Sequence, residues 1–435
     1  MAISPFEQRY RTEMNSILED DRKIQKWMAV EVALAKAHAK LGNIPEDAPS
    51  KIEEAASKVK FERVLEIEAE IHHDLMAMVK ALTEQAGDAG KYIHLGATSY
   101  DIEDTATALI FMEAIDLLAS DLAKLRDLLK KLAIENKERV CIGRTHGQHA
   151  VPMTYGLKFA LYYQEIKRSL DRLSSAKERV AVGKMSGAVG TMATFKGQGP
   201  EIQELVMSEL GLEPAPVTNQ VVQRDRHAEV ICDLALVAAA VEKIAKEIRN
   251  LQRTEILEIS EGFGKKQVGS STMPHKRNPH KSERLCSLAR LVRANVVTAI
   301  ENIALEHERD LTNSANERAI FGESFICTHY MVLELTKILG KLDFSDDNIQ
   351  KNLELTHGLI MAERLMIALT DKGMGRQEAH EVVRTAAQEA FSTKKHLKDL
   401  VIEKKLLDEN DAKMVFDYST YIGNAVQIVE NATKD

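Results

Sequence analysis

The sequence predicts an all-α protein built from long helices that pack as a bundle. Nine prolines are distributed so that residues 50–151, 217–273 and 280–435 contain none. Since proline interrupts a helix, long helices can run through these three stretches. Two rows of apolar residues recur at steps of three and four, the spacing of one helix face, and period-two alternation dominates nowhere. The rows are Leu118, Leu122, Leu125, Leu129 and Leu132, and Val230, Leu234, Val237, Val241, Ile244, Ile248 and Leu251.

The length of these rows predicts how the helices are organised. Long apolar faces must be buried against other helices, and 435 residues exceed what one hydrophobic core usually serves. We expect three helical domains: an N-terminal domain over 1–95, a central long-helix bundle over 96–342 and a C-terminal domain over 343–435. Rows of this length, with alanines at 238–240, could pack between subunits as readily as within one.

Composition and charge limit the classes of function. Hydrophobic residues make up 44% and charged residues 29%, with a formal net charge of −8, which describes an ordinary soluble globular protein. This balance argues against nucleic acid as a partner. Four widely spaced cysteines without a CxxC pair favour reduced thiols, and the first 20 residues do not form a signal peptide. No apolar run is long enough to cross a membrane, so we expect a cytoplasmic protein with no membrane partner.

Residues 269–279 combine serine hydroxyls, an imidazole, two fixed cations and a carboxamide in a segment punctuated by glycine and two prolines. Glycine and proline there predict a loop. Lys276 and Asn278 could together hold a carboxylate whose negative charge grows during a reaction. The alternative is a solvated basic turn. Glu283 begins a further helix and could pair with a histidine, keeping it protonated.

Residues 143–152 place His146 and His149 three apart, beside glycine and proline. Metal binding is the weaker interpretation, because no third ligand lies nearby in sequence. A general acid is the stronger one, because histidine can hold a proton near neutral pH and release it to a leaving nitrogen. We therefore expect neither a metal site nor an organic cofactor.

Four other segments carry polar residues in patterns that suit an anionic ligand. Residues 94–105 predict a helix start, where Thr98 or Ser99 caps free amides that can also bind anions. Arg309 and Arg318 around Ser314 form a plausible phosphate clamp, or else ordinary surface charge. The glycines of 183–191 favour close backbone packing, since no phosphate-loop ending follows them. Adjacent His72 and His73, read within one amphipathic helix, point about 100° apart and cannot easily bind one metal ion.

The run 269–279 resembles the signature loop of the fumarase/aspartase superfamily, and its His-Lys-Arg-Asn-Pro ending is similar to that of the adenylosuccinate lyase family. Residues 94–101 resemble the family's His-x-Gly-x-Thr-Ser-x-Asp, and 143–152 its Gly-Arg-Thr-His-Gly-x-His-Ala-x-Pro. The stretch from 356 onward resembles the family's C-terminal helical domain. Further matching segments, in family order, are 9–10, 72–74, 183–191, 218–227 and 306–318.

The resemblance implies roles for individual residues. Ser270 would be the base and His146 the acid. The residues implied to bind substrate are Arg9, Tyr10, His72, His73, Asp74, His94, Thr98, Ser99, Gln220, Ser271, Lys276, Asn278, Glu283, Arg309, Ser314 and Arg318. His72 stands where the family usually has arginine, and Asn313, Ala315 and Asn316 depart from its usual pattern.

The function that the resemblance implies is release of fumarate from adenylosuccinate, giving AMP, and from succinyl-aminoimidazole-carboxamide ribotide. The superfamily's members are homotetramers, so active sites shared between subunits are expected. Two alternatives are a 3-carboxymuconate cycloisomerase-like enzyme, which is expected to lack the acid histidine, and a catalytically silent structural relative such as some lens crystallins.

Overall fold

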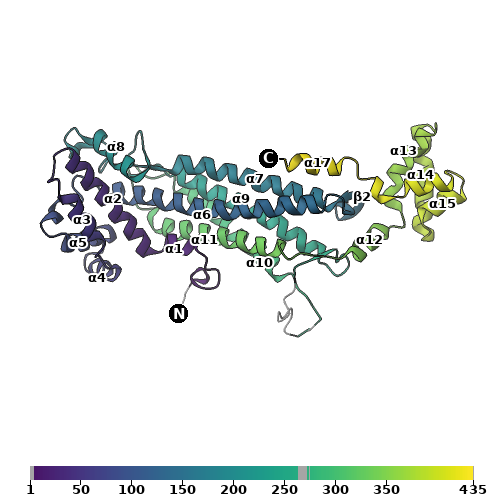
Figure 1. Cartoon of the computed structure of the whole chain (residues 1–435), viewed down its shortest axis with the longest axis horizontal. Helices are drawn as coiled ribbons and strands as arrows, with labels where there is room; N and C mark the ends of the chain where they lie inside the picture. Colours follow the sequence, from purple (N-terminus) through teal and green to yellow (C-terminus); the bar gives the residue numbers. More distant parts are fainter. Residues whose placement is uncertain (1–3, 263–271, 274, 435) are drawn as a thin grey trace. The chain divides into compact units, whose positions relative to one another are not determined.

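The computed structural model describes residues 4–262, 272–273 and 275–434, and these residues form a predominantly helical structure (Figure 1). The predicted all-α class is confirmed. Among the described residues, strands form only three two-stranded sheets. Ser270 and Ser271, the predicted base and its neighbour, lie outside the described residues.

The chain divides into two compact units, each assembled from three separate segments. The first unit comprises residues 1–122, 169–239 and 287–333, and the second comprises 123–168, 240–286 and 334–435. The three-domain division at 95 and 342 stays a prediction.

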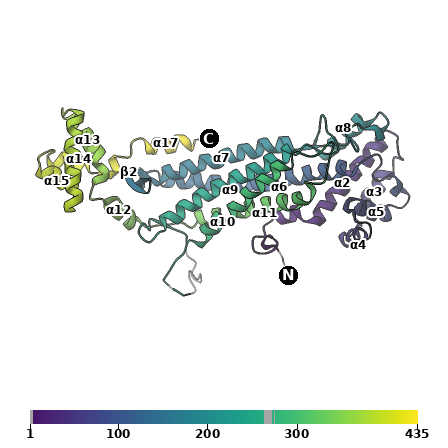
Figure 2. The ribbon, with the colours of Figure 1, turned by 180° about the vertical axis from the view of Figure 1, so that it is seen from behind.

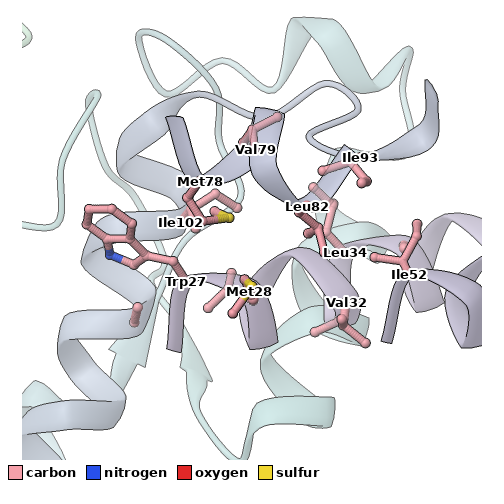
Figure 3. Close-up of a cluster of buried hydrophobic side chains, with 14 of the residues drawn as sticks. Trp27, Met28, Val32, Leu34, Ile52, Met78, Val79, Leu82, Ile93 and Ile102 are labelled. Atoms are coloured by element: carbon pink, nitrogen blue, oxygen red, sulfur yellow. The ribbon is translucent and has the colours of Figure 1, made fainter. Parts of the chain in front are cut away.

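The first unit begins with short helices that enclose a hydrophobic core. Figure 3 shows this core, in which apolar side chains from the N-terminal helices point toward one another. The labelled members are Trp27, Met28, Val32, Leu34, Ile52, Met78, Val79, Leu82, Ile93 and Ile102. The helices are α1 (Met14–Leu18), α2 (Asp20–Lys40), α3 (Ala48–Ala56), α4 (Phe61–Ile71), α5 (Asp74–Ala86) and α8 (Gly199–Leu210).

Five helices are 22 to 37 residues long: α6 (Ser99–Glu135), α7 (Tyr155–Val180), α9 (Asp225–Leu251), α10 (His280–Glu301) and α11 (Ser314–Leu339). Every residue of the two predicted apolar rows, on α6 and α9, is buried, so the predicted faces are confirmed. The predicted helix start is also confirmed, because α6 begins at Ser99. The hydrogen bond that the structure gives at this start comes from Asp101, whose carboxylate accepts the Thr98 N–H at 2.9 Å, and not from the predicted Thr98 or Ser99 hydroxyl.

The second unit contains a β-hairpin that the helical pattern did not predict. Strand β1 (Val140–Thr145) pairs antiparallel with β2 (Gln148–Thr154). The unit ends in a group of short helices, of which α13, α14 and α15 pack together (Figure 2). The C-terminal helices are α12 (Asp346–Glu354), α13 (Ala362–Asp371), α14 (Arg376–Thr393), α15 (Leu397–Glu403), α16 (Glu409–Val415) and α17 (Ala425–Ala432).

The remaining elements are short. Parallel strands β3 (Val182–Gly183) and β4 (Glu213–Pro214) pair in the first unit, and β5 (Ile259–Ser260) pairs with β6 (Asp343–Phe344) in the second. Short 3₁₀-helices are η1 (Pro5–Glu7), η2 (Gly87–Tyr92), η3 (Ala193–Phe195), η4 (Leu359–Met361) and η5 (Tyr418–Thr420). Within the described part of the chain, none of the helices is both long enough and apolar enough to span a membrane.

Candidate active site

The predicted site residues fall into both compact units. Those in the first unit are Arg9, Tyr10, His72, His73, Asp74, His94, Thr98, Ser99, Gln220, Arg309, Ser314 and Arg318. Those in the second unit are His146, Lys276, Asn278 and Glu283.

A cavity of about 300 Å³ lies in the first unit, between α2, α6 and α11. Ser314 and Arg318, two members of the predicted phosphate clamp, line it from α11. Tyr100 and Glu103 line it from the first turns of α6. Trp27 of α2 contributes an apolar wall. A polar end beside an apolar wall suits a ligand with one charged group and one flat, less polar part.

Arg318 is held at this cavity by a carboxylate from a distant helix. Its Nη2 lies 2.5 Å from Oδ2 of Asp74, the first residue of α5. Burial is the largest single influence and favours the neutral form of both groups, but their hydrogen bond and mutual attraction, joined at Asp74 by the Leu75 N–H, together outweigh it, so the pKa of Arg318 is raised and that of Asp74 is lowered. Two residues predicted from separate motifs therefore meet in one ion pair.

Arg309 does not line the cavity but supports its edge. Its guanidinium lies 3.6 Å from the centre of the Tyr100 ring, and its Nη1 donates to Oε1 of Gln220 at 2.8 Å. The Tyr100 hydroxyl is hydrogen-bonded in turn to Ser314. Gln220, Arg309, Tyr100 and Ser314 thus form one connected group. The Arg309 Nε is buried and has no partner among the described residues, which leaves a donor for a ligand.

A buried ion-pair network in the wall of the cavity fixes α6 against α11. Arg224 lies 2.9 Å from Asp104 and 2.8 Å from Glu317. Asn313 donates to the same Glu317 carboxylate at 2.9 Å, and Asn316 exchanges hydrogen bonds with Asn302. The departures from the family pattern at 313 and 316 therefore serve packing.

His72 and His73 require a correction, because they do not lie within one helix. Helix α4 ends at Ile71, and His72 adopts left-handed backbone angles with φ 54°. His73 then caps α5, its Nδ1 accepting the Met76 N–H at 3.4 Å. Histidine tolerates the left-handed region better than most residues, so the amphipathic pattern continues across a break that it does not reveal. Both side chains are exposed.

His94 is bound on its Nδ1 by a buried acid. The Glu31 carboxylate lies 2.6 Å from this nitrogen and accepts the His94 backbone N–H at 2.9 Å. Burial lowers the pKa of His94, but Glu31 and then Asp101 outweigh burial, so the pKa is raised. Asp101 also binds Lys184, Ser186 and Gly187 of the glycine-rich segment. That segment packs closely, as predicted: a Cβ on Gly190 would lie 2.1 Å from the carbonyl oxygen of Thr218.

The N-terminal Arg9-Tyr10 pair is anchored through its neighbours. The Tyr10 ring lies 5.0 Å from that of Tyr330, measured between centroids, and the Thr12 hydroxyl lies 2.9 Å from Nδ1 of His329. These contacts fix the segment on α11. Arg9 is exposed.

In the second unit, His146 lies at the turn of the β1–β2 hairpin, exposed and with a left-handed φ of 53°. His149 lies on β2, where burial, and then the charge of Arg144, lower its pKa. His149 is therefore neutral at neutral pH and poorly suited to deliver a proton. Among the described residues, no group of three or more His, Cys, Asp or Glu side chains could hold a metal ion.

The end of the 269–279 segment is fixed to its surroundings. Gln252, the residue after α9, donates to the Arg277 carbonyl at 3.0 Å, and the Lys276 N–H donates to the Met273 carbonyl at 3.0 Å. Glu283 lies in the first turn of α10, and its N–H donates to the Pro279 carbonyl at 2.9 Å. Lys276 is exposed and Asn278 half-buried.

Glu258 holds the His146 hairpin in place, and no sequence pattern pointed to it. It is 1% exposed and binds Arg144 of β1, Tyr155 of α7 and Asn352 of α12, the last at 2.8 Å. All of these residues belong to the second unit.

Glu258→Ala is expected to destabilise the protein by about 3–5 kcal/mol, because it leaves Arg144 and two further buried donors without their acceptor. Glu258→Gln keeps the side-chain volume and part of the hydrogen bonding, so it should lower the free energy of unfolding by less than Glu258→Ala does. Chemical denaturation of both variants measures this, with exposed Glu255→Ala as the control. Equal stability of Glu258→Ala and Glu255→Ala would contradict the anchoring role.

Sequence reasoning missed Tyr100, Glu103 and Glu258 as contributors. Tyr100 and Glu103 fall within the 94–105 motif, at positions to which the motif assigns no role. Their place among the motif residues was the signal that could have identified them. Because 100, 103, 104 and 107 lie on one helix face, the helix start at Ser99 would have placed both beside Asp104.

Fold and motif order together define a lyase of the fumarase/aspartase superfamily. The family model described as lyase matches residues 5–294. The solved structure of 3-carboxy-cis,cis-muconate lactonizing enzyme from Pseudomonas putida is similar, with a TM-score of 0.91, 30% identity and 98% of each chain covered. A fumarate lyase from Mesorhizobium sp. BNC1 gives a TM-score of 0.89 at 31% identity, with 97% of each chain covered.

The chain belongs to the adenylosuccinate lyase family. The model described as adenylosuccinate lyase C-terminus matches residues 358–432. Adenylosuccinate lyase from Pyrococcus abyssi is 56% identical, covering 99% of this chain and 97% of that protein. Adenylosuccinate lyase from Methanothermobacter thermautotrophicus is 51% identical, covering 100% of this chain and 99% of that protein.

Proposed function

We propose that the protein cleaves adenylosuccinate to AMP and fumarate, and that it releases fumarate from succinyl-aminoimidazole-carboxamide ribotide in purine biosynthesis. The observation that carries the proposal is that Ser314 and Arg318 line one cavity together with Tyr100, against whose ring Arg309 packs. Guanidinium groups bind phosphate well, and both substrates carry a phosphate ester.

The chemical step is a β-elimination that breaks a carbon–nitrogen bond. Ser270 takes the proton from the carbon beside a succinyl carboxylate, whose negative charge then grows. Lys276 and Asn278 stabilise this dianion, and Ser271 binds a carboxylate. His146 protonates the leaving nitrogen as the carbon–carbon double bond of fumarate forms. A serine base requires nearby cations and amides that lower its pKa.

The remaining residues bind and orient the substrate. Arg309, Ser314 and Arg318 bind its phosphate, and Gln220 holds Arg309 in place. The other proposed binding residues are Arg9, Tyr10, His72, His73, Asp74, His94, Thr98, Ser99 and Glu283. No step needs a metal ion or an organic cofactor.

We also propose a cytoplasmic homotetramer whose active sites are shared between subunits. Support comes from apolar side chains in the C-terminal half of α10, where Leu291, Val297 and Ile300 are each about half exposed. Leu236 of α9 is exposed as well. Apolar faces of this kind are typical of surfaces that another subunit covers. All four cysteines are free thiols, which suits a reducing compartment.

Incubation of the purified protein with adenylosuccinate tests the proposal. The ultraviolet difference spectrum should change, and AMP and fumarate should form in equal amounts, with or without a chelator. A matched incubation with 3-carboxymuconate tests the cycloisomerase alternative. Turnover of that compound alone, or of neither, would overturn the proposal, and loss of activity with chelator would overturn its cofactor-free mechanism.

Arg318→Ala should raise the Michaelis constant for adenylosuccinate about tenfold or more, with a smaller effect on turnover. The reason is that a charge-assisted hydrogen bond to phosphate contributes about 1.5–3 kcal/mol in ground and transition states alike. Steady-state kinetics measures the effect. Arg179→Ala, which removes an arginine paired with Glu229 on the surface of the same unit, is the control. An unchanged Michaelis constant in Arg318→Ala would refute the phosphate role.

A further inference from the structure

Glu103 is an unpaired carboxyl group in a cavity that is proposed to bind phosphate. It lies on the face of α6 that also presents Tyr100, Asp104 and Thr107 to the cavity. Asp104 is neutralised by Arg224 at 2.9 Å. The side-chain carboxyl of Glu103, in contrast, is half-buried and makes no hydrogen bond and no ion pair with any residue that the structure describes. A half-buried acid that lines a cavity without a protein partner is free to contact a ligand there.

The positive charges around Glu103 do not balance the negative charge that it would carry when ionised. Asp74 faces it from α5, Asp104 from α6, Arg318 from α11, and Arg309 from the segment before α11. The groups lining the cavity are four acids and three bases: Asp20, Glu103, Asp104 and Glu317, against Lys23, Arg224 and Arg318. With Glu103 ionised the acids outnumber the bases, and with Glu103 neutral the two are equal.

The protonation state of Glu103 follows from this environment. Burial first, and then the charges of Asp74 and Asp104, raise its pKa to about 8, against the opposing effect of Arg309 and Arg318. In the empty protein, Glu103 therefore holds its proton at neutral pH and loses it as the pH rises through about 8. An ionised carboxylate there would repel a phosphate dianion, whereas a neutral carboxylic acid can donate a hydrogen bond.

We infer that Glu103 binds the substrate phosphate as a neutral carboxylic acid, donating its O–H to a phosphate oxygen beside Ser314 and Arg318. This inference rests on the proposed phosphate role of those two residues. Where Glu103 is ionised in the empty protein, phosphate binding takes up one proton from solvent, which forms the O–H of Glu103. The cavity thereby selects phosphate with a donor that carries no charge, and phosphate affinity falls at alkaline pH.

Calorimetric titration of the full-length protein with AMP measures this proton uptake. Binding heats are recorded at pH 7 and pH 9 in pairs of buffers that differ in ionisation enthalpy. The AMP phosphate is mainly a dianion at pH 7 and almost wholly one at pH 9, since its second pKa lies near 6. Proton uptake at pH 9 should exceed that at pH 7, and adenosine, which lacks the phosphate, should show no such excess. Affinity for AMP should fall by up to about tenfold for each pH unit above 8.

Two substitutions separate the charge of Glu103 from its hydrogen bond. Glu103→Gln keeps a neutral donor, so it should bind AMP at pH 7 within a few-fold of the unchanged protein, lose the extra proton uptake and flatten the pH dependence. Glu103→Met is neutral without a donor, and it should bind about tenfold more weakly than Glu103→Gln. Asp20→Asn, at an exposed acid of the same cavity paired with Lys23, is the control and should retain the proton uptake.

The inference is overturned if Glu103→Gln takes up as many protons as the unchanged protein, or if Glu103→Met binds AMP as tightly as Glu103→Gln. Equal proton uptake with AMP and with adenosine by the unchanged protein overturns it too, independently of any variant. Turnover of adenylosuccinate is assayed separately. A protein that forms AMP and fumarate but shows no phosphate-linked uptake refutes only the role of Glu103, whereas one that neither binds AMP nor turns over substrate refutes the proposed function.

Discussion

Replacing Ser270 by alanine is expected to lower turnover of adenylosuccinate by about 10³-fold or more while the protein still binds its substrate. The hydroxyl is proposed to act only in proton removal, and positioned acid–base groups typically contribute on the order of 10²–10⁴ in rate. Lys276, Arg309 and Arg318 remain to supply ground-state binding, so the loss should fall on turnover. Steady-state kinetics, with substrate affinity measured on the inactive variant, separates the two quantities.

The neighbouring hydroxyls provide matched controls for this experiment. Ser271→Ala should mainly weaken carboxylate binding, and Thr272→Ala, at an exposed position, should have little effect. Near-normal turnover in Ser270→Ala together with severe loss in Ser271→Ala would show that the base is the second serine.

Mixing two inactive variants is expected to restore activity, because His146 and Ser270 are proposed to reach one site from different subunits. The first variant should be His146→Asn, since His146 has φ 53° and asparagine tolerates left-handed angles better than alanine does. The second is Ser270→Ala. After random reassembly at equal input, about a quarter of the sites should combine an intact histidine with an intact serine.

Recovery is measured as specific activity after dissociation and reassembly, with mixed tetramers verified by a mass tag on one variant. Each variant reassembled alone serves as the control and should stay inactive. If both residues came from one chain, every site would carry a lesion. Verified mixed tetramers without recovered activity would therefore rule out the shared site.

The sequence predicted the helical core well because burial there repeats along the chain. Both apolar rows, on α6 and α9, are buried at every position. Local breaks were harder to predict. His72 ends α4 in a left-handed conformation while the apolar spacing continues, and the β1–β2 hairpin depends on pairing rather than on helical periodicity. The spacing of apolar residues indicates which face of a helix is buried, but it does not indicate a single residue at which the backbone leaves the helical conformation.

Part of the candidate site could likewise be predicted from the sequence, and part of it could not. Motifs identified Asp74, Gln220, Arg309, Ser314 and Arg318, and the structure joins them into two contacting groups, one around each arginine. Glu258 could not be predicted, because its partners at 144, 155 and 352 come together only in the folded chain. Glu258 anchors the hairpin only through tertiary contacts with residues that are far apart in sequence.

The balance of charge around the cavity has a consequence for selectivity. A site that gathers surplus positive charge attracts any polyanion, and its affinity depends steeply on ionic strength. Here Arg318 is already paired with Asp74, Arg224 is paired with Asp104 and Glu317, and the whole chain carries a formal charge of −8. Long-range attraction is therefore expected to add little to recognition at this cavity, and selectivity should come from the geometry of short, charge-assisted hydrogen bonds. A polyanion that cannot make these hydrogen bonds should gain little from its charge alone.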